Sequence, residues 1–177
     1  MRKGFPDGKP FFERTDIMEI RTATMADLAA VTHLEAICFP PAEAASEESF
    51  AQRLMCYPSH FWLLMDGDTV VSFVNGLVTD DPDLRDEMYD NAALHDDNGA
   101  WQMIFGVDTH PDYRCQGCAA RLLNHAIAQS RAQGRKGLVL TCKERLVPYY
   151  SKFGFVSEGI SQSTHGDVIW YQMRLTL

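Results

Sequence analysis

The segment from Gln102 to Arg131 has the residue types and spacing of an anion-binding turn. An apolar strand through Val107 leads into Arg114-Cys115-Gln116-Gly117-Cys118-Ala119, and a helical pattern follows. A turn that feeds directly into a helix leaves backbone N–H groups unpaired, and these groups and the helix dipole favour a phosphate. Gly117 has no side chain to obstruct a ligand, and Arg114 adds a fixed positive charge. The segment is therefore predicted to bind a phosphate group.

A second segment could supply a proton. Its sequence is Leu146-Val147-Pro148-Tyr149-Tyr150-Ser151-Lys152-Phe153-Gly154-Phe155. A tyrosine with an unperturbed pKa of about 10 stays protonated at neutral pH, which suits an acid. The alternative interpretation of Tyr150 is an aromatic side chain that packs its helix on a sheet.

These segments resemble parts of a known superfamily. The pattern Arg-x-x-Gly-x-Ala at Arg114 resembles the pyrophosphate-binding signature of the GNAT acyl-CoA-dependent N-acetyltransferases, and residues 146–155 closely resemble their serotonin (arylalkylamine) N-acetyltransferase branch. With Phe39-Pro40 and Cys142, the resemblance spans residues 18–175. It implies the GNAT fold, which is α/β (α+β). In this fold a mixed, mostly antiparallel twisted sheet of about seven strands has helices on both faces and is splayed between the fourth and fifth strands.

The resemblance also implies a reaction. Acetyl-CoA would be the co-substrate, and the acceptor would be a primary amine, either a small arylalkylamine or a polyamine. Direct transfer in a ternary complex needs a neutral amine, a donor to the tetrahedral oxyanion and a proton for the leaving thiolate. The resemblance assigns the last role to Tyr150.

The same resemblance assigns the binding residues. The pantetheine and pyrophosphate would contact Val107, Asp108, Thr109, Arg114, Cys115, Gln116, Gly117, Cys118, Ala119 and Ala120. A second strand would contribute Thr141, Cys142 and Lys143. The amine pocket would be walled by Phe39 and Pro40, and Met103 and Phe105 would also contact the substrate.

The chain departs from this branch where a base is expected. In animal members two histidines on the strand before the phosphate turn assist deprotonation of the amine, and Met103 and Phe105 occupy those positions. Neither side chain accepts a proton. The alternative candidates are Asp108, His110, Glu144 and His165. A site that disfavours the ammonium form by desolvation would need only a weak base. A non-catalytic acyl-CoA-binding or sensor module is therefore the alternative function.

Cys115 and Cys118 form a Cys-x-x-Cys motif at a helix N-terminus, where a thiolate is stabilised. A redox role would require a thioredoxin-type order of elements, which does not surround this motif. A zinc site would require two further ligands at matching spacing, and the sequence has no second cysteine pair. We therefore predict no metal and place the motif in the acyl-CoA turn, which oxidation of the pair would deform.

The hydrophobic pattern predicts the elements that position these residues. Residues 1–16 show no periodicity and are interpreted as an extension of a single domain, residues 17–177. Strands are predicted at residues 17–21, 60–65, 69–78, 100–108, 138–142, 154–158 and 168–175. Helices are predicted at residues 24–36, 46–55, 117–133 and 146–152, with a short helix at 84–88 in an acidic insertion.

Composition limits the partners. The chain has 177 residues, a net charge of −8 and a pI of about 5.1, so nucleic acid and anionic membranes are unlikely partners, whereas a small amine is compatible. No apolar run reaches the roughly 20 residues of a membrane span, and no signal peptide is evident. Five cysteines without a framework spacing indicate reduced thiols and a cytoplasmic location. The protein is expected to be a monomer or a homodimer.

Overall fold

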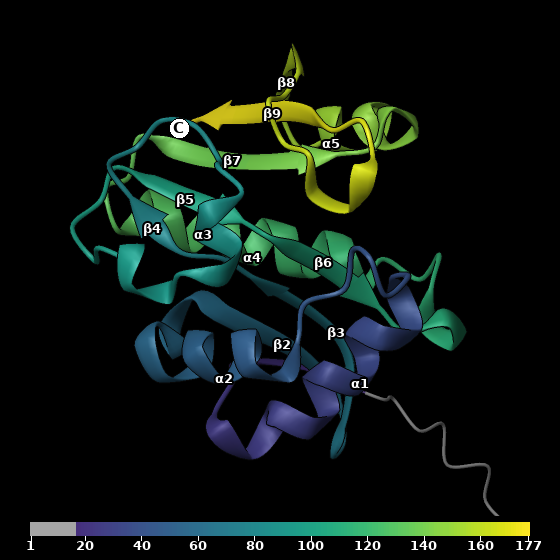
Figure 1. Ribbon diagram of the computed structural model, residues 1–177. Coiled ribbons are helices and arrows are strands. Elements are labelled where there is room, and N and C mark those ends of the chain that lie inside the picture. Colours follow the sequence, from purple (N-terminus) through teal and green to yellow (C-terminus); the bar gives the residue numbers. More distant parts are fainter. Residues whose placement is uncertain (1–16) are drawn as a thin grey trace, which may run out of the picture.

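The computed structural model describes residues 17–177, and the predicted extension, residues 1–16, lies outside the described residues (Figure 1). Two sheets lie at its centre. The first is antiparallel, in the order β1-β2-β3-β6. It comprises β1 (Glu19–Thr22), β2 (Phe61–Asp66), β3 (Thr69–Asn75) and β6 (Gly106–Thr109).

The second sheet has the order β4-β5-β7-β9-β8, in which β5 and β7 are parallel. It comprises β4 (Val78–Thr79), β5 (Trp101–Ile104), β7 (Gly137–Cys142), β8 (Val156–Ile160) and β9 (Tyr171–Thr176).

Helices cover both faces of the first sheet. On one face, α1 (Leu28–Cys38) and α2 (Glu47–Cys56) form a core with Phe61, Leu63 and Phe73. On the other face, α4 (Cys118–Ala132) packs on Trp62 and Leu64, the alternate residues of β2. This alternation follows from the period-2 geometry of a strand. Figure 1 shows α4 behind the sheets and α1 and α2 below them, and the prediction of helices on both faces is confirmed.

The predicted strand over residues 100–108 is interrupted at Phe105. Before the interruption, Ile104 of β5 lies opposite Leu140 of β7; after it, Gly106 of β6 lies opposite Asn75 of β3. The chain therefore changes sheets at this point, and β6 diverges from β7 (Figure 1). The predicted splay between the two central strands is confirmed.

The predicted strand over residues 69–78 is also divided. A Cβ at Gly76 would lie 1.8 Å from the carbonyl oxygen of Met103, so the backbone passes β5 at a distance that only glycine allows. The ladder is broken there, and β4 resumes two residues later. In the described part of the chain, the seven predicted strands are consequently nine shorter ones.

Most other predicted boundaries hold within two or three residues. Thr24 precedes a 3₁₀ turn that leads into α1, and the hydroxyl group of Ser46 accepts the N–H of Ser49 at the start of α2. The helix predicted at residues 84–88 begins later, as α3 (Glu87–Asp90), and α5 spans Val147–Ser151. β9 begins at Tyr171 because residues 165–167 form a 3₁₀ turn. None of the described helices has the length and apolar character needed to cross a membrane.

Candidate active site

The predicted phosphate-binding turn has an open backbone. Gly117 caps α4 with φ +79°, and Cys115 also has a positive φ of +59°. The first i to i−4 bond of the helix joins the N–H of Arg121 to the carbonyl oxygen of Gly117 at 3.0 Å, so the N–H groups of residues 118–120 precede it. A Cβ at Gly117 would meet no atom within 4 Å. These features suit an anion, and phosphate binding stays a prediction.

The side chains of this turn are directed in different ways. Arg114 is exposed, and its Nε donates to the carbonyl oxygen of Thr109 at 3.2 Å. Its Nη2 lies 3.8 Å from Sγ of Cys38. Gln116 donates from Nε2 to the carbonyl oxygen of Asp112 at 3.0 Å. The guanidinium of Arg114 therefore lies against the end of β6.

Within the Cys-x-x-Cys motif, Cys118 does not have the thiolate environment that its position suggested. Cys118 is buried in the core, where its Sγ donates to the carbonyl oxygen of Tyr113 at 3.5 Å. Burial raises the pKa of the Cys118 thiol, so a stabilised thiolate is wrong for this residue. Cys115 is exposed, and all five cysteines are free. Because its side chain is buried, the predicted cofactor contact of Cys118 would have to come from its backbone.

A cavity of about 250 Å³ lies in the splay between β6 and β7. Among the predicted site residues, it is lined by Phe39, Phe105, Val107, Thr141, Cys142 and Tyr150. Residues that the sequence analysis did not single out also line it, namely Glu35, Glu43, Arg53, Tyr89 and Trp170. The cavity therefore joins the predicted acceptor wall to the predicted acid.

Two residues predicted to contact the substrate do not line this cavity. Met103 has no exposed surface and packs in a core cluster with Tyr57, Leu77 and Val139. Pro40 is exposed on the loop after α1, where its carbonyl oxygen accepts the N–H groups of Glu43 and Ala44. Burial places the Met103 side chain away from the cavity, whereas substrate contact by the exposed Pro40 stays a prediction.

Tyr150 has the environment of a proton donor. Its side chain is almost fully buried, and it lines the cavity. Burial raises the pKa of Tyr150, and the neighbouring Cys142 adds to the shift, so the phenol stays protonated well above neutral pH. Burial likewise raises the pKa of Cys142 to about 11. Both groups are therefore neutral in the apolar part of the site.

Two loops meet over the cavity. The loop after α1 contributes Glu43, whose carbonyl oxygen accepts a hydrogen bond from Nε2 of His165 at 2.9 Å. His165 belongs to the loop between β8 and β9, which descends towards the loop after α1 in Figure 1. Its ring stacks on Tyr89, with centroids 5.1 Å apart and an interplanar angle of 28°. Aromatic rings and the two loops thus bound the acceptor side of the cavity.

Arg53 brings an unusual charge to the cavity wall. It is only 4% exposed, and its guanidinium donates to Oδ1 of Asn75 at 3.0 Å and to the carbonyl oxygen of Tyr89 at 2.8 Å. The rings of Phe50 and Phe105 lie 5.3 and 5.0 Å from its central carbon. Among residues 17–177 no carboxylate pairs with it. Arg53 is therefore a buried cation held by neutral groups.

The base candidates from the sequence are widely separated. His110 accepts the N–H of Asp112 at Nδ1, beside the phosphate turn, and Glu144 is exposed. Of the four candidates, only His165 lines the cavity. Asp108 is 1% exposed and lies behind the cavity wall, against α1.

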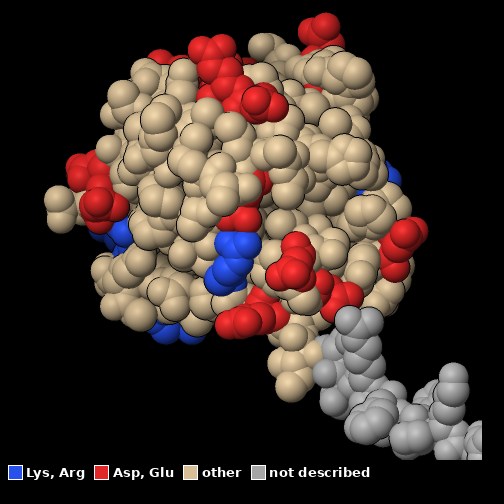
Figure 2. Space-filling model, turned by 90° about the horizontal axis from the view of Figure 1, so that it is seen from below, with Lys and Arg blue, Asp and Glu red and all other residues tan. Residues whose placement is uncertain are grey.

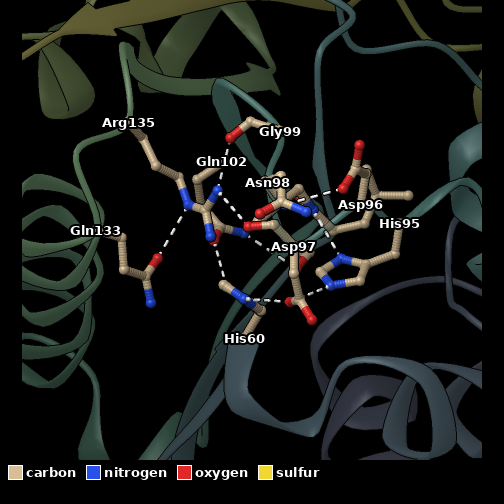
Figure 3. A network of polar contacts seen from close by, with 12 residues as sticks. His60, His95, Asp96, Asp97, Asn98, Gly99, Gln102, Gln133 and Arg135 are labelled. Atoms are coloured by element: carbon tan, nitrogen blue, oxygen red, sulfur yellow. Dashed lines mark hydrogen bonds and ion pairs between the residues drawn. The ribbon is translucent and has the colours of Figure 1, made fainter.

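A second polar cluster lies outside the cavity (Figure 3). His60, His95 and Asp97 bring potential ligand atoms within 4.8 Å of one another. However, Nδ1 of His95 accepts the N–H of Val78 at 3.0 Å, so Nε2 of His95 carries the proton that it donates to Asp97 at 2.8 Å. His60 donates from Nδ1 to Gln102 at 2.7 Å. These hydrogen bonds hold the loop before β5 in place. The ligand atoms that they leave for a metal are the lone pair of His60 and the Asp97 carboxylate.

Comparison with known proteins agrees with this geometry. Residues 28–155 match the family described as the acetyltransferase (GNAT) family. Serotonin N-acetyltransferase of Mesocricetus auratus is 29% identical over 112 residues, which are 61% of this chain and 51% of that protein. The chain thus spans about half the length of this curated relative.

Solved structures share the fold. The loading GNATL domain of CurA from Lyngbya majuscula has a TM-score of 0.77 at 17% identity, over 90% of this chain and 97% of that one. The ribosomal-protein-S18-alanine N-acetyltransferase from Escherichia coli has a TM-score of 0.69 at 21% identity, over 90% and 94%. The splayed sheet with helices on both faces thus defines the fold of this class of domain. The chain belongs to the acetyltransferase (GNAT) family.

Proposed function

We propose that the protein transfers the acetyl group of acetyl-CoA directly to a small primary amine. The observation that carries this proposal is the protonated Tyr150 facing a cavity at the splay, where β6 and β7 have backbone edges that do not pair with each other. Membership in an acetyltransferase family supports it. The pantetheine arm would lie between these edges as an added strand, and the open turn at Gly117 would hold the pyrophosphate.

The residues present fit each requirement of the donor. The amine nitrogen attacks the thioester carbonyl carbon, a C–N bond forms and the C–S bond breaks. Tyr150 donates its proton to the departing sulfur. This proton is needed because the low polarity around Cys142 destabilises a thiolate. Because burial keeps Tyr150 protonated, the acid is available throughout the neutral range.

The cavity favours an arylalkylamine over a polyamine. Its acceptor side carries the rings of Phe39, Tyr89, Phe105 and Trp170. A polyamine would bring two or more positive charges towards Arg53, which has no carboxylate partner among the described residues. Coulomb repulsion in a partly desolvated site is severalfold stronger than in water. Similarity to serotonin N-acetyltransferase of Mesocricetus auratus supports the same choice.

The loops over the cavity favour a small amine over a protein N-terminus. Glu43 is bonded to both Lys143 and His165, so the loop after α1 is joined to β7 and to the β8–β9 loop. An extended peptide would have to displace these contacts. The acidic side chains spread over the face in Figure 2 suit the approach of a cationic amine.

The test is release of free thiol from acetyl-CoA with tryptamine, phenylethylamine, spermidine and a lysine peptide. We expect turnover with the two arylalkylamines and a large loss of kcat in Tyr150→Phe, with acetyl-CoA binding retained. Tyr149→Phe is the matched control, because Tyr149 neighbours Tyr150 but does not line the cavity. Binding of acetyl-CoA without thiol release above background would favour the acyl-CoA-binding module instead.

A further inference from the structure

We propose that Glu35, backed by Asp108, accepts the proton of the acceptor amine. This inference rests on the proposed function and supplies the base that Met103 and Phe105 do not. Glu35 lies near the end of α1 and lines the cavity, and Asp108 lies on β6 directly behind it. Among the base candidates predicted from the sequence, Asp108 had no partner and Glu35 was absent.

The two carboxyl groups are buried and in contact. Glu35 is 6% exposed and Asp108 is 1% exposed. Within residues 17–177, no donor bonds to either carboxyl oxygen of Asp108. In contrast, Glu35 is fixed in place, because its Oε1 accepts the N–H of Ala45 at 2.9 Å. A buried carboxyl group without a donor is costly as an anion, so Asp108 must obtain its hydrogen bond as an acid.

The contact bears on the protonation of Asp108. A second acidic group in contact disfavours an additional negative charge. Burial raises the pKa of Asp108 well above its usual range, and the Glu35 and Cys38 side chains add to the shift. Asp108 therefore holds the proton, and Glu35 is the member of the pair that lies on the side of the cavity.

Gly106 opens the cavity wall next to this pair. It lines the cavity, and a Cβ at this position would lie 3.1 Å from Oδ1 of Asp108 and 3.3 Å from Nδ2 of Asn75. The same Asn75 binds Arg53 through its Oδ1. A carboxyl pair, an amide and a guanidinium thus follow one another along the wall.

The other titratable groups near the cavity have partners, lie at its rim or serve as the acid. The carboxylate of Glu43 is paired with Lys143, and the Nε2 proton of His165 is bonded to the Glu43 carbonyl oxygen. Asp90 is exposed at the rim. Tyr150 stays protonated and serves as the acid. Glu35 is the buried carboxylate of the lining that no described cation neutralises.

The nitrogen of the bound ammonium loses two protons in the reaction. The bound ammonium gives one proton to Glu35, and the neutral nitrogen attacks the thioester carbonyl carbon. As the C–S bond breaks, the sulfur takes the proton of Tyr150. The second proton of the nitrogen restores Tyr150, and Glu35 releases its proton to solvent. The overall products are the amide, free CoA and one proton.

The test is the dependence of kcat/KM on pH with tryptamine. The wild type should lose activity as pH falls, because a base must be unprotonated to accept the proton of the amine. Glu35→Gln keeps an oxygen for the N–H of Ala45 and should lose about 100-fold or more in kcat/KM. The acidic limb of its pH profile should disappear, and kcat/KM should rise only with the fraction of amine that is unprotonated. Glu144→Gln, an exposed matched control outside the cavity, should behave as the wild type.

Three further variants keep the outcome decisive. Asp108→Asn should move the acidic limb to higher pH, because an amide stabilises the Glu35 carboxylate less than a carboxylic acid does. Glu35→Asp should retain the limb at a lower kcat, and this variant decides the matter if Glu35→Gln fails to bind acetyl-CoA. His165→Gln should retain the acidic limb of the pH profile, whether or not its kcat/KM is reduced.

Each contrary result has a distinct meaning. Suppose that the wild type is active. If Glu35→Gln then keeps the acidic limb unchanged, or if only His165→Gln loses it, the inference is overturned and the proposed function stands. A wild type that binds acetyl-CoA but releases no thiol with any amine overturns both.

Discussion

Lys143 and Glu43 form an ion pair that joins the end of β7 to the loop after α1. Nζ of Lys143 lies 2.9 Å from Oε2 and 3.0 Å from Oε1 of Glu43. The side chain of Glu43 is 6% exposed, and the ammonium also lies 5.8 Å from the ring centroid of Trp170. This pair connects two parts of the cavity boundary that are one hundred residues apart in the sequence.

Lys143→Met should therefore loosen the cavity boundary. The nearly buried Glu43 carboxylate would lose its cation, and we expect a loss of about 1–2 kcal/mol in the free energy of unfolding. KM for the amine should rise more than KM for acetyl-CoA. Urea denaturation and steady-state kinetics measure the two effects. Lys152→Met, at an exposed site, is the control, and an equal response in both variants would contradict a specific role for the pair.

Gly117→Ala should separate backbone strain from ligand obstruction. An alanine with φ near +79° costs about 1 kcal/mol of stability. Gly134 is a matched control, because it has φ +71° and, like Gly117, would place a Cβ in open space. Thermal unfolding should show similar losses for the two alanine variants. Calorimetric titration should show weaker acetyl-CoA binding for Gly117→Ala alone; equal affinities would remove the turn from the phosphate site.

Alkylation by iodoacetamide at neutral pH should distinguish the two cysteines of the Cys-x-x-Cys motif. Cys115 is exposed, whereas Cys118 is buried and its thiol has a raised pKa. Because the thiolate is the reactive form, Cys115 and the exposed Cys56 should be modified first. Peptide mapping by mass spectrometry follows each site. Rapid modification of Cys118 in the folded protein would restore the redox interpretation.

The stability of Asp108→Asn should depend on pH relative to the wild type. Burial raises the pKa of Asp108, so the folded protein holds a proton that the unfolded chain releases above about pH 3.8. Wild-type stability due to this group is complete below that pH and declines as pH rises towards the folded pKa. Asparagine resembles the neutral acid at every pH. The Tm of Asp108→Asn minus that of the wild type should therefore increase as the pH rises above about 3.8.

A difference in Tm that stays constant across this range would mean that Asp108 is ionised in the folded protein. Asp112→Asn is the control, because Asp112 is exposed beside the same turn. This measurement needs no substrate, so it tests the protonation of the carboxyl pair independently of turnover.

Local features of the site were accessible from the sequence. The turn at Gly117 and the cap at Ser46 depend on the conformations that a few consecutive residues prefer, and these form as predicted. Tyr150 follows from its own segment, and it lies at the cavity. Glu35 also left a signal, because it follows Val31 by four residues on the apolar face of its helix.

The sequence by itself determined the family, the turn and the tyrosine, since each depends on neighbours along the chain. Only the tertiary structure decided which way β6 faces. In one continuous strand, Ile104 and Asp108 would share a face. The break at Phe105 resets this alternation: Ile104 packs in the core cluster with α4, whereas Asp108 faces Glu35 of α1. A one-residue irregularity, fixed by pairing to two different sheets, created the carboxyl pair.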